Sequence, residues 1–295
     1  MVARLQQLIV IVWFAMAIAW GAWWLPGAPA LAVTGIAALA LAHAAVLAVE
    51  FTTSRWISAG DARPRASALQ FAAAWCSEAV LALRVFAWAQ PFRSRAVPDH
   101  LPQRPRQGVV LVHGFLCNRG FWNPWLRELR RDDRAFVAVD LEPPLGSIDA
   151  YVHAIDDAVA KVSDATGQPP LLVCHSMGGL AARAWLLQGG AGRVPRIVTL
   201  GTPHGGTWLA RFGRAPNGRQ MRIGGEWLQR LANKPGDAER TEFTCWYSDC
   251  DNVVFPISTA TLPGADNLLA AGLGHVAIAF DLRVRRETLA LLKPD

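Results

Sequence analysis

The segment 171–180 places a serine between an apolar run and a glycine-rich helix start. Leu171–His175 (LLVCH) is apolar and predicts a buried strand, whereas Gly178 and Gly179 open a stretch with helical spacing. A serine at such a strand-to-helix turn stands clear of the sheet, and the tight turn needs small neighbours. We therefore interpret Ser176 as a nucleophile, and the alternative is an ordinary helix N-cap.

Two later segments supply groups that could activate this serine. Asp251 follows a predicted strand at 243–247, and His275 lies in a loop flanked by glycines. Asp249, two residues before Asp251, is a rival for the acid. A histidine base can take a serine proton while a carboxylate orients the base, so the order Ser176, Asp251, His275 indicates nucleophilic acyl transfer.

A further loop could stabilise the negative charge that develops on a substrate carbonyl oxygen. The apolar run 110–112 predicts a strand that ends at His113 and Gly114. The backbone N–H of Phe115 can then point at the nucleophile and form a two-donor oxyanion hole with the N–H of Met177. A plain strand-ending turn is the alternative.

The elements that must position these groups alternate regularly from residue 107 onward. The predicted strands are 108–112, 135–141, 171–175, 196–200 and 243–247, and the predicted helices are 121–131, 147–162 and 178–187. Uniformly apolar strands that alternate with helices favour a parallel sheet covered on both faces, which is an α/β fold.

Residues 107–295 resemble the α/β-hydrolase superfamily and, within it, bacterial triacylglycerol lipases and their esterase relatives. The matching stretches are Val112–Phe115 (VHGF), Cys174–Gly179 (CHSMGG), Leu200–Thr207 (LGTPHGGT), Asp251–Val254 (DNVV) and Gly274–His275. Cys174 replaces the first glycine of the usual Gly-x-Ser-x-Gly pattern and is small enough to fit. The resemblance implies a doubly wound, mostly parallel sheet. It also implies that Ser176 is the nucleophile, Asp251 orients the base, and His275 is base and then acid.

The resemblance also bears on cofactors. Some secreted lipases that resemble this sequence bind calcium through an aspartate two residues after the catalytic histidine. Here that position is Ala277, so we expect neither a metal nor another cofactor.

The expected reaction is hydrolysis of carboxylic esters, in particular acylglycerol lipids, through an acyl-enzyme on Ser176. The connection at about 205–240 is long and apolar, with seven basic and three acidic residues. We interpret it as a small cap that suits a lipid ester, with a solvated loop as the alternative. An acyltransferase or thioesterase that uses the same three groups, or an idle hydrolase fold that serves as a binding module, are the other hypotheses.

The N-terminal 52 residues predict a membrane hairpin. No Asp, Glu, Lys or Arg occurs from residue 5 to residue 49, and Pro26–Pro29 (PGAP) divides this stretch into two runs, 5–25 and 30–49. Each run is long enough to cross a bilayer, and the break predicts a turn. A signal peptide cleaved at 30–32 and a buried core hairpin are the alternatives.

Charge at the ends of the hairpin predicts its orientation. Arginines flank both ends and none lies in the tight turn, so both ends and the catalytic domain are expected in the cytoplasm, at the inner membrane. Residues 66–90 include Glu78 and Arg84, which would be costly at mid-bilayer. We interpret this segment as an amphipathic helix on the membrane surface or against the next domain. The expected organisation is thus 1–52 hairpin, 53–106 juxtamembrane helix and linker, and 107–295 hydrolase domain.

Composition excludes several other classes of protein. Of 295 residues, 52% are hydrophobic and 18% charged, which is too apolar for a disordered chain, and five cysteines are too few for a disulfide scaffold. The net charge is +6, and residues 52–106 contribute eight arginines against three acidic residues. This juxtamembrane charge favours anionic lipid as a partner, and we expect no nucleic acid.

Overall fold

The computed structural model describes residues 1–63, 65–232 and 241–293, and its core is a six-stranded sheet. The strands are β1 Val109–Val112, β2 Phe136–Val139, β3 Leu171–His175, β4 Arg196–Leu200, β5 Glu242–Tyr247 and β6 Asp266–Leu269. All neighbours pair in parallel, in the order β2-β1-β3-β4-β5-β6. The predicted α/β class with a parallel sheet is confirmed. Strand β6 is not among the predicted strands, because this short edge strand alternates exposed and half-buried residues and begins with two polar ones.

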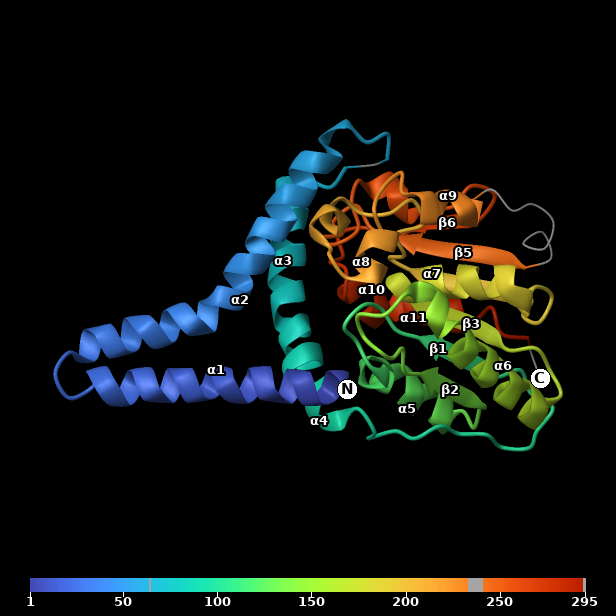
Figure 1. The fold of residues 1–295 in the computed structure, drawn as a ribbon, viewed down its shortest axis with the longest axis horizontal. Coiled ribbons are helices and arrows are strands. Elements are labelled where there is room, and N and C mark those ends of the chain that lie inside the picture. Colours follow the sequence, from blue (N-terminus) through green and yellow to red (C-terminus); the bar gives the residue numbers. More distant parts are fainter. Residues whose placement is uncertain (64, 233–240, 294–295) are drawn as a thin grey trace.

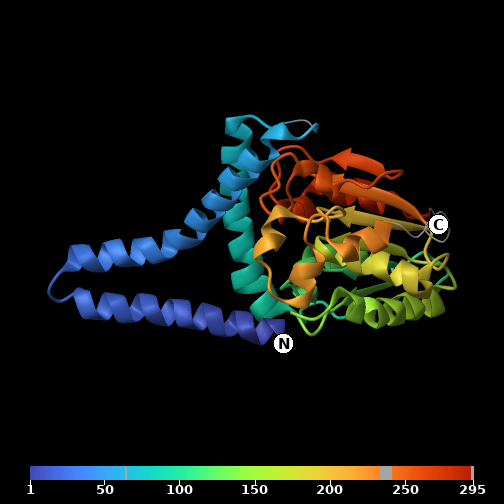
Figure 2. The same cartoon turned by 45° about the horizontal axis from the view of Figure 1, so that its top comes forward.

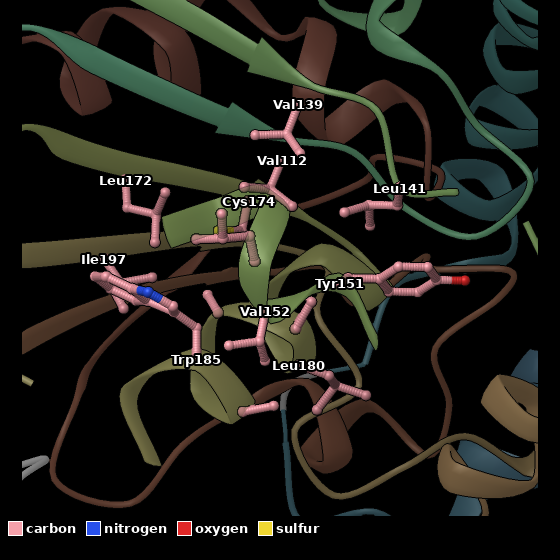
Figure 3. Close-up of a cluster of buried hydrophobic side chains, with 14 of the residues drawn as sticks. Val112, Val139, Leu141, Tyr151, Val152, Leu172, Cys174, Leu180, Trp185 and Ile197 are labelled. Atoms are coloured by element: carbon pink, nitrogen blue, oxygen red, sulfur yellow. The ribbon is translucent and has the colours of Figure 1, made fainter. Parts of the chain in front are cut away.

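Helices cover both faces of this sheet (Figure 1). They include α5 Asn123–Arg131, α6 Val152–Thr166, α7 Met177–Trp185, α10 Ala277–Phe280 and α11 Leu282–Leu289. Val110 and Val112 pack with α6 and α7 on one face, as the close-up in Figure 3 shows for Val112. Val109 and Leu111 pack with α5 and α11 on the other face. Successive strand residues point to opposite faces, so two covered faces explain why these strands are apolar throughout.

The hairpin helices are α1 Val2–Trp24 and α2 Pro29–Ile57, which lie side by side and project from the domain (Figures 1 and 2). Both are longer than the predicted runs, and α2 continues from residue 49 through Glu50 to Ile57. Large apolar side chains along the hairpin are exposed. Three segments, 2–24, 29–60 and 68–93, are long and apolar enough to cross a membrane. This surface indicates membrane association, because a soluble surface rarely exposes so much contiguous apolar area.

The third apolar segment lies against the domain that contains the sheet. Helix α3 Ala68–Ala82 continues through a π-helical stretch, Leu83–Ala89, into α4 Gln90–Arg93, and runs across the direction of the hairpin (Figures 1 and 2). Its buried residues, Ala74, Glu78, Ala82 and Val85, share one face. The structure shows segment 66–90 packed on the next domain, which is one of the two expected positions, and its relation to the membrane surface stays a prediction.

Candidate active site

Ser176 occupies a strained turn between β3 and α7. Its φ is 54° and its ψ −128°, a backbone conformation that side-chain-bearing residues rarely adopt. Two hydrogen bonds hold this turn: the Ser176 N–H donates to the Leu200 carbonyl (2.9 Å), and the Thr202 hydroxyl donates to the Ser176 carbonyl (2.8 Å). The serine is 7% exposed. The strand-to-helix turn expected at Ser176 is therefore present at the end of β3, and the role of Ser176 as a nucleophile stays a prediction.

His275 pairs with Asp251. Its Nδ1 lies 2.9 Å from Asp251 Oδ2, and because a carboxylate only accepts, Nδ1–H is the donor. The other oxygen, Oδ1, accepts from the N–H groups of Val253 and Val254, both at 2.8 Å. Asp249, the rival acid, instead accepts from the Gly272 N–H at 2.7 Å. The Nε2 of the buried His275 is consequently left unprotonated and able to accept a proton.

The surrounding charges favour protonation of His275. Burial by itself lowers the pKa of a histidine, but the charge and hydrogen bond of Asp251, with smaller contributions from Glu78 and Glu50, more than offset this effect. The pKa of His275 is therefore raised above its usual value. A base of this kind can hold the serine proton while the acyl group is transferred.

His175 connects the serine turn to the His275 loop. Its Nε2–H donates to the His275 carbonyl at 3.1 Å, and the two ring centroids are 4.7 Å apart. Burial, followed by the nearby His275 charge, lowers the pKa of His175 well below its usual value, so this ring is neutral. A Cβ added at Gly201, the residue after Leu200, would lie 3.2 Å from both Asp251 Oδ2 and His275 Nδ1. Ser176 follows β3, Asp251 follows β5 and His275 lies in the loop after β6, and the ends of these strands thus bring the three predicted residues into one region.

The predicted oxyanion donors lie on both sides of Ser176. A Cβ added at Gly114 would be 2.8 Å from the Ser176 Cβ, so only glycine allows this loop to approach the serine so closely. Phe115 follows directly. Met177 is the first residue of α7, where a backbone N–H has no intrahelical acceptor. The Met177 N–H thus lies directly after the serine and Phe115 follows the glycine that approaches it, and their role as oxyanion donors stays a prediction.

Several polar residues at this site were not identified from the sequence. Glu78 on α3 accepts from the N–H groups of Val276 (2.7 Å) and Ala277 (3.0 Å), directly after His275. Glu50 on α2 accepts from Asn252 Nδ2 at 2.8 Å. The signal for Glu78 in the sequence is a single carboxylate within an otherwise apolar helical segment, and such a residue is costly in a bilayer unless protein donors satisfy it.

Further contacts tie the N-terminal helices to the loops around the site. The Asn252 side-chain oxygen accepts from the His275 N–H at 3.1 Å, and the Ser54 hydroxyl donates to the Asp251 carbonyl at 2.5 Å. Near the oxyanion loop, the Asn118 N–H donates to Gln90 Oε1 at 2.9 Å. The acid loop, the histidine loop and the oxyanion loop each contact a helix that precedes the sheet.

The predicted cap at 205–240 is described as far as residue 232, and 233–240 lie outside the described residues. The described part forms a 3₁₀ turn at Trp208–Phe212, α8 Pro216–Gln220 and α9 Glu226–Ala232. Trp227 is buried against the core, whereas Phe212 is exposed. Within the described ranges, no group of three or more His, Cys, Asp or Glu residues is arranged to hold a metal.

Comparison with known proteins places this architecture in a family. The profile of the Alpha/beta hydrolase family matches residues 109–272. A search of curated proteins finds no significant match.

Solved structures with a similar fold include two lipases. The mature form of Bacillus licheniformis lipase BlEst2 has a TM-score of 0.54 and 19% identity, over 62% of this chain and 90% of that one. Aspergillus fumigatus lipase B has a TM-score of 0.51 and 18% identity, over 61% of this chain and 52% of that one. At these identities the likeness is one of fold. Because the matching family profile spans more than half of the chain, the protein is a member of the α/β-hydrolase family.

Proposed function

We propose that this protein is a membrane-anchored serine hydrolase that cleaves carboxylic esters through an acyl-enzyme on Ser176. The observation that carries the proposal is the 2.9 Å hydrogen bond from His275 to Asp251, beside a serine on a strained strand-to-helix turn. A serine, a base with an unprotonated nitrogen and an orienting carboxylate together perform nucleophilic acyl transfer.

In the proposed reaction, His275 Nε2 takes the proton of Ser176 Oγ as this oxygen attacks the ester carbonyl. The resulting oxyanion accepts hydrogen bonds from the N–H groups of Phe115 and Met177. The protonated imidazole then gives its proton to the leaving alcohol, and Asp251 stabilises its charge in the meantime. Water, deprotonated by His275, attacks the acyl-enzyme, releases the carboxylic acid and restores the serine.

We propose lipid esters such as acylglycerols as the substrate class. The support is the position of the site: the loops that carry Asp251 and His275 touch α2 and α3, next to the exposed apolar hairpin. A catalytic centre there is close to the acyl chains of a bilayer. The two structural relatives described above are named lipases, which agrees with this substrate class.

We further propose that residues 1–52 form two spans with both ends on the cytoplasmic side of the inner membrane. Arg4 precedes the first span, and Arg55, Arg63 and Arg65 follow the second. Residues 53–106 then lie at the membrane surface, and the hydrolase domain 107–295 is cytoplasmic. In this arrangement, the glutamate of α3 faces protein rather than lipid.

Ester hydrolysis by the wild type and Ser176→Ala tests the proposal. The full chain in detergent is assayed with a short p-nitrophenyl ester, and Ser163→Ala on α6 serves as the control. We expect the Ser176 variant to lose hydrolysis and labelling by a fluorophosphonate probe, and the control to keep both. Equal rates for the wild type and Ser176→Ala would eliminate the serine-hydrolase assignment. Thioester substrates and alternative acyl acceptors then separate an esterase from a thioesterase or an acyltransferase.

The same probe tests the proposed orientation. In sealed, oriented membrane vesicles, a membrane-impermeant fluorophosphonate labels Ser176 only from the side on which the hydrolase domain lies. We expect labelling from the cytoplasmic side, and labelling only from the opposite side would contradict two spans with cytoplasmic ends.

A further inference from the structure

The catalytic histidine loop rests on a carboxylate that comes from outside the hydrolase sheet. We propose that Glu78 on α3 is a positioning residue for His275, so that the N-terminal helices complete the catalytic centre. This inference rests on the proposed function. It makes the helices a part of the enzyme and not only its anchor.

Both carboxylate oxygens of Glu78 accept hydrogen bonds from the loop of His275. Oε1 accepts from the Val276 N–H and Oε2 from the Ala277 N–H, at 2.7 and 3.0 Å, and the residue is 1% exposed. A buried carboxylate is costly unless it is hydrogen-bonded, and the two N–H groups would lose their acceptor without it. These two bonds fix the backbone immediately after His275.

Gly274 shows how closely Glu78 approaches the loop. A Cβ added at Gly274 would lie 2.5 Å from Glu78 Oε2 and 2.6 Å from its Cδ. Non-bonded contacts of a Cβ atom are essentially never this short. Any other residue at position 274 would therefore displace either the carboxylate or the loop. The glycine before His275 is therefore explained by a side chain almost 200 positions earlier in the sequence.

A second carboxylate acts on the same loop through an intermediate. Glu50 accepts from the Asn252 amide, and the oxygen of this amide accepts from the His275 N–H. The Ser54 hydroxyl, one helical turn further along α2, bonds the Asp251 carbonyl. Both members of the acid–base pair are thus held from α2, and the loop of His275 is held from α3 as well. A shift of these helices would move His275 relative to Ser176.

Electrostatics provide a second route from Glu78 to His275. The titratable groups that face His275 are the carboxylates Asp251, Glu78 and Glu50 and the neutral ring of His175. Each carboxylate, when ionised, favours the imidazolium that forms during acyl transfer. Burial raises the pKa of Glu78 to about 7, so its charge acts most fully above neutral pH. A glutamate that merely docked a helix would affect stability, but it would change neither the turnover number at saturating substrate nor the pH dependence of catalysis.

The test compares Glu78→Ala and Glu78→Gln with the wild type, as full chains in detergent, and uses a p-nitrophenyl ester. Ser77→Ala, at the adjacent exposed position on α3, is the matched control. We expect Glu78→Ala to lower kcat about 10–100-fold while KM stays nearly constant, since a displaced catalytic group costs rate at this scale. Glu78→Gln keeps one acceptor oxygen but loses the charge. It should lose less activity, and the acidic limb of its kcat/KM profile should move to lower pH.

Fluorophosphonate labelling separates positioning from misfolding. We expect Glu78→Gln to reach the wild-type labelling stoichiometry at a lower rate, with an unchanged far-UV circular dichroism spectrum. If Glu78→Ala does not fold, kcat and the pH profile of Glu78→Gln are sufficient to test the inference. Wild-type kcat and pH limb in Glu78→Gln, or a loss that follows only the fraction of folded protein, would overturn the inference. If the wild type itself neither hydrolyses esters nor labels at Ser176, the proposed function has failed instead.

Discussion

The outer and inner parts of the N-terminal helices differ in what their side chains contact. The outer part, α1 and α2 up to residue 49, exposes large apolar side chains such as Phe14, Ile18 and Leu41. The inner part, from residue 50 to α4, places Glu50, Ser54 and Glu78 in hydrogen bonds with the loops of the predicted triad.

The difference shows how one apolar segment can serve two purposes. Apolar side chains without protein neighbours are stable in lipid, whereas a carboxylate is tolerated only where protein donors satisfy it. Glu50, the first charged residue after the apolar run 5–49, therefore marks where α2 begins to contact the loops of the predicted triad.

Ser54 in the inner part contacts the loop of Asp251, so the inner part borders the catalytic centre if Asp251 is the catalytic acid. We expect Asp251→Asn to lower kcat about 10⁴-fold, because an amide no longer holds His275 in the required tautomer. Asp249→Asn is the control, since an amide oxygen can still accept from the Gly272 N–H. Steady-state kinetics of both variants measure the effect. A larger loss of kcat in Asp249→Asn than in Asp251→Asn would contradict the assignment of Asp251 as the catalytic acid.

The outer part should be intolerant of charge. Ile11 on α1 is 58% exposed, and we expect Ile11→Lys to weaken membrane insertion by about 3 kcal/mol. The fraction of protein that sediments with membranes should fall, while kcat in detergent stays at the wild-type value. Leu291→Lys, near the C-terminus, is the control and should leave the membrane fraction unchanged. A loss of detergent activity in Ile11→Lys would mean that the outer part also supports the site.

The close approach at Gly274 can be tested by a double-mutant cycle. We expect Gly274→Ala to lower kcat about tenfold or more, since the added Cβ displaces Glu78 or the loop. In a Glu78→Ala background the same change should cost much less, because the clashing carboxylate is absent. Fully additive effects on log kcat would show that the two residues act independently.

The smallest expected effect is a shift in pH dependence. Burial lowers the pKa of His275, but Asp251, Glu78 and Glu50 together raise it by a larger amount. The pKa of His275 is therefore above its usual value. Activity needs the neutral imidazole and is therefore lost as the pH falls through this raised pKa. Glu50→Gln removes one negative charge, so the acidic limb of kcat/KM should move to lower pH.

Glu128→Gln, whose carboxylate pairs with Arg285 between α5 and α11 at 2.6 Å, is the control for this measurement. Its acidic limb should coincide with that of the wild type. A shift of the same size in both variants would indicate a general effect of net charge and not a contact near His275.

The elements of the sheet could be predicted because their signals are local. Strands β3 and β4 match the predicted bounds, since a strand buried on both faces is apolar at most positions. The edge strand β6 could not be found this way, because an edge strand with one exposed face has a weaker pattern. Likewise, spacing alone left Asp249 and Asp251 as alternatives, and only the geometry shows which of them bonds His275.

The sequence alone was enough to predict the available chemistry, from a serine at a strand end followed by a carboxylate and a histidine. It was also enough to predict which segment suits a lipid environment, from the long run without charge. The hydrogen-bond partners of Glu50, Ser54 and Glu78 are known only from the tertiary structure. Their partners lie 197 to 202 positions away along the chain. Composition and periodicity report on neighbours within a turn or a strand, whereas contacts at such separation depend on how whole elements pack together.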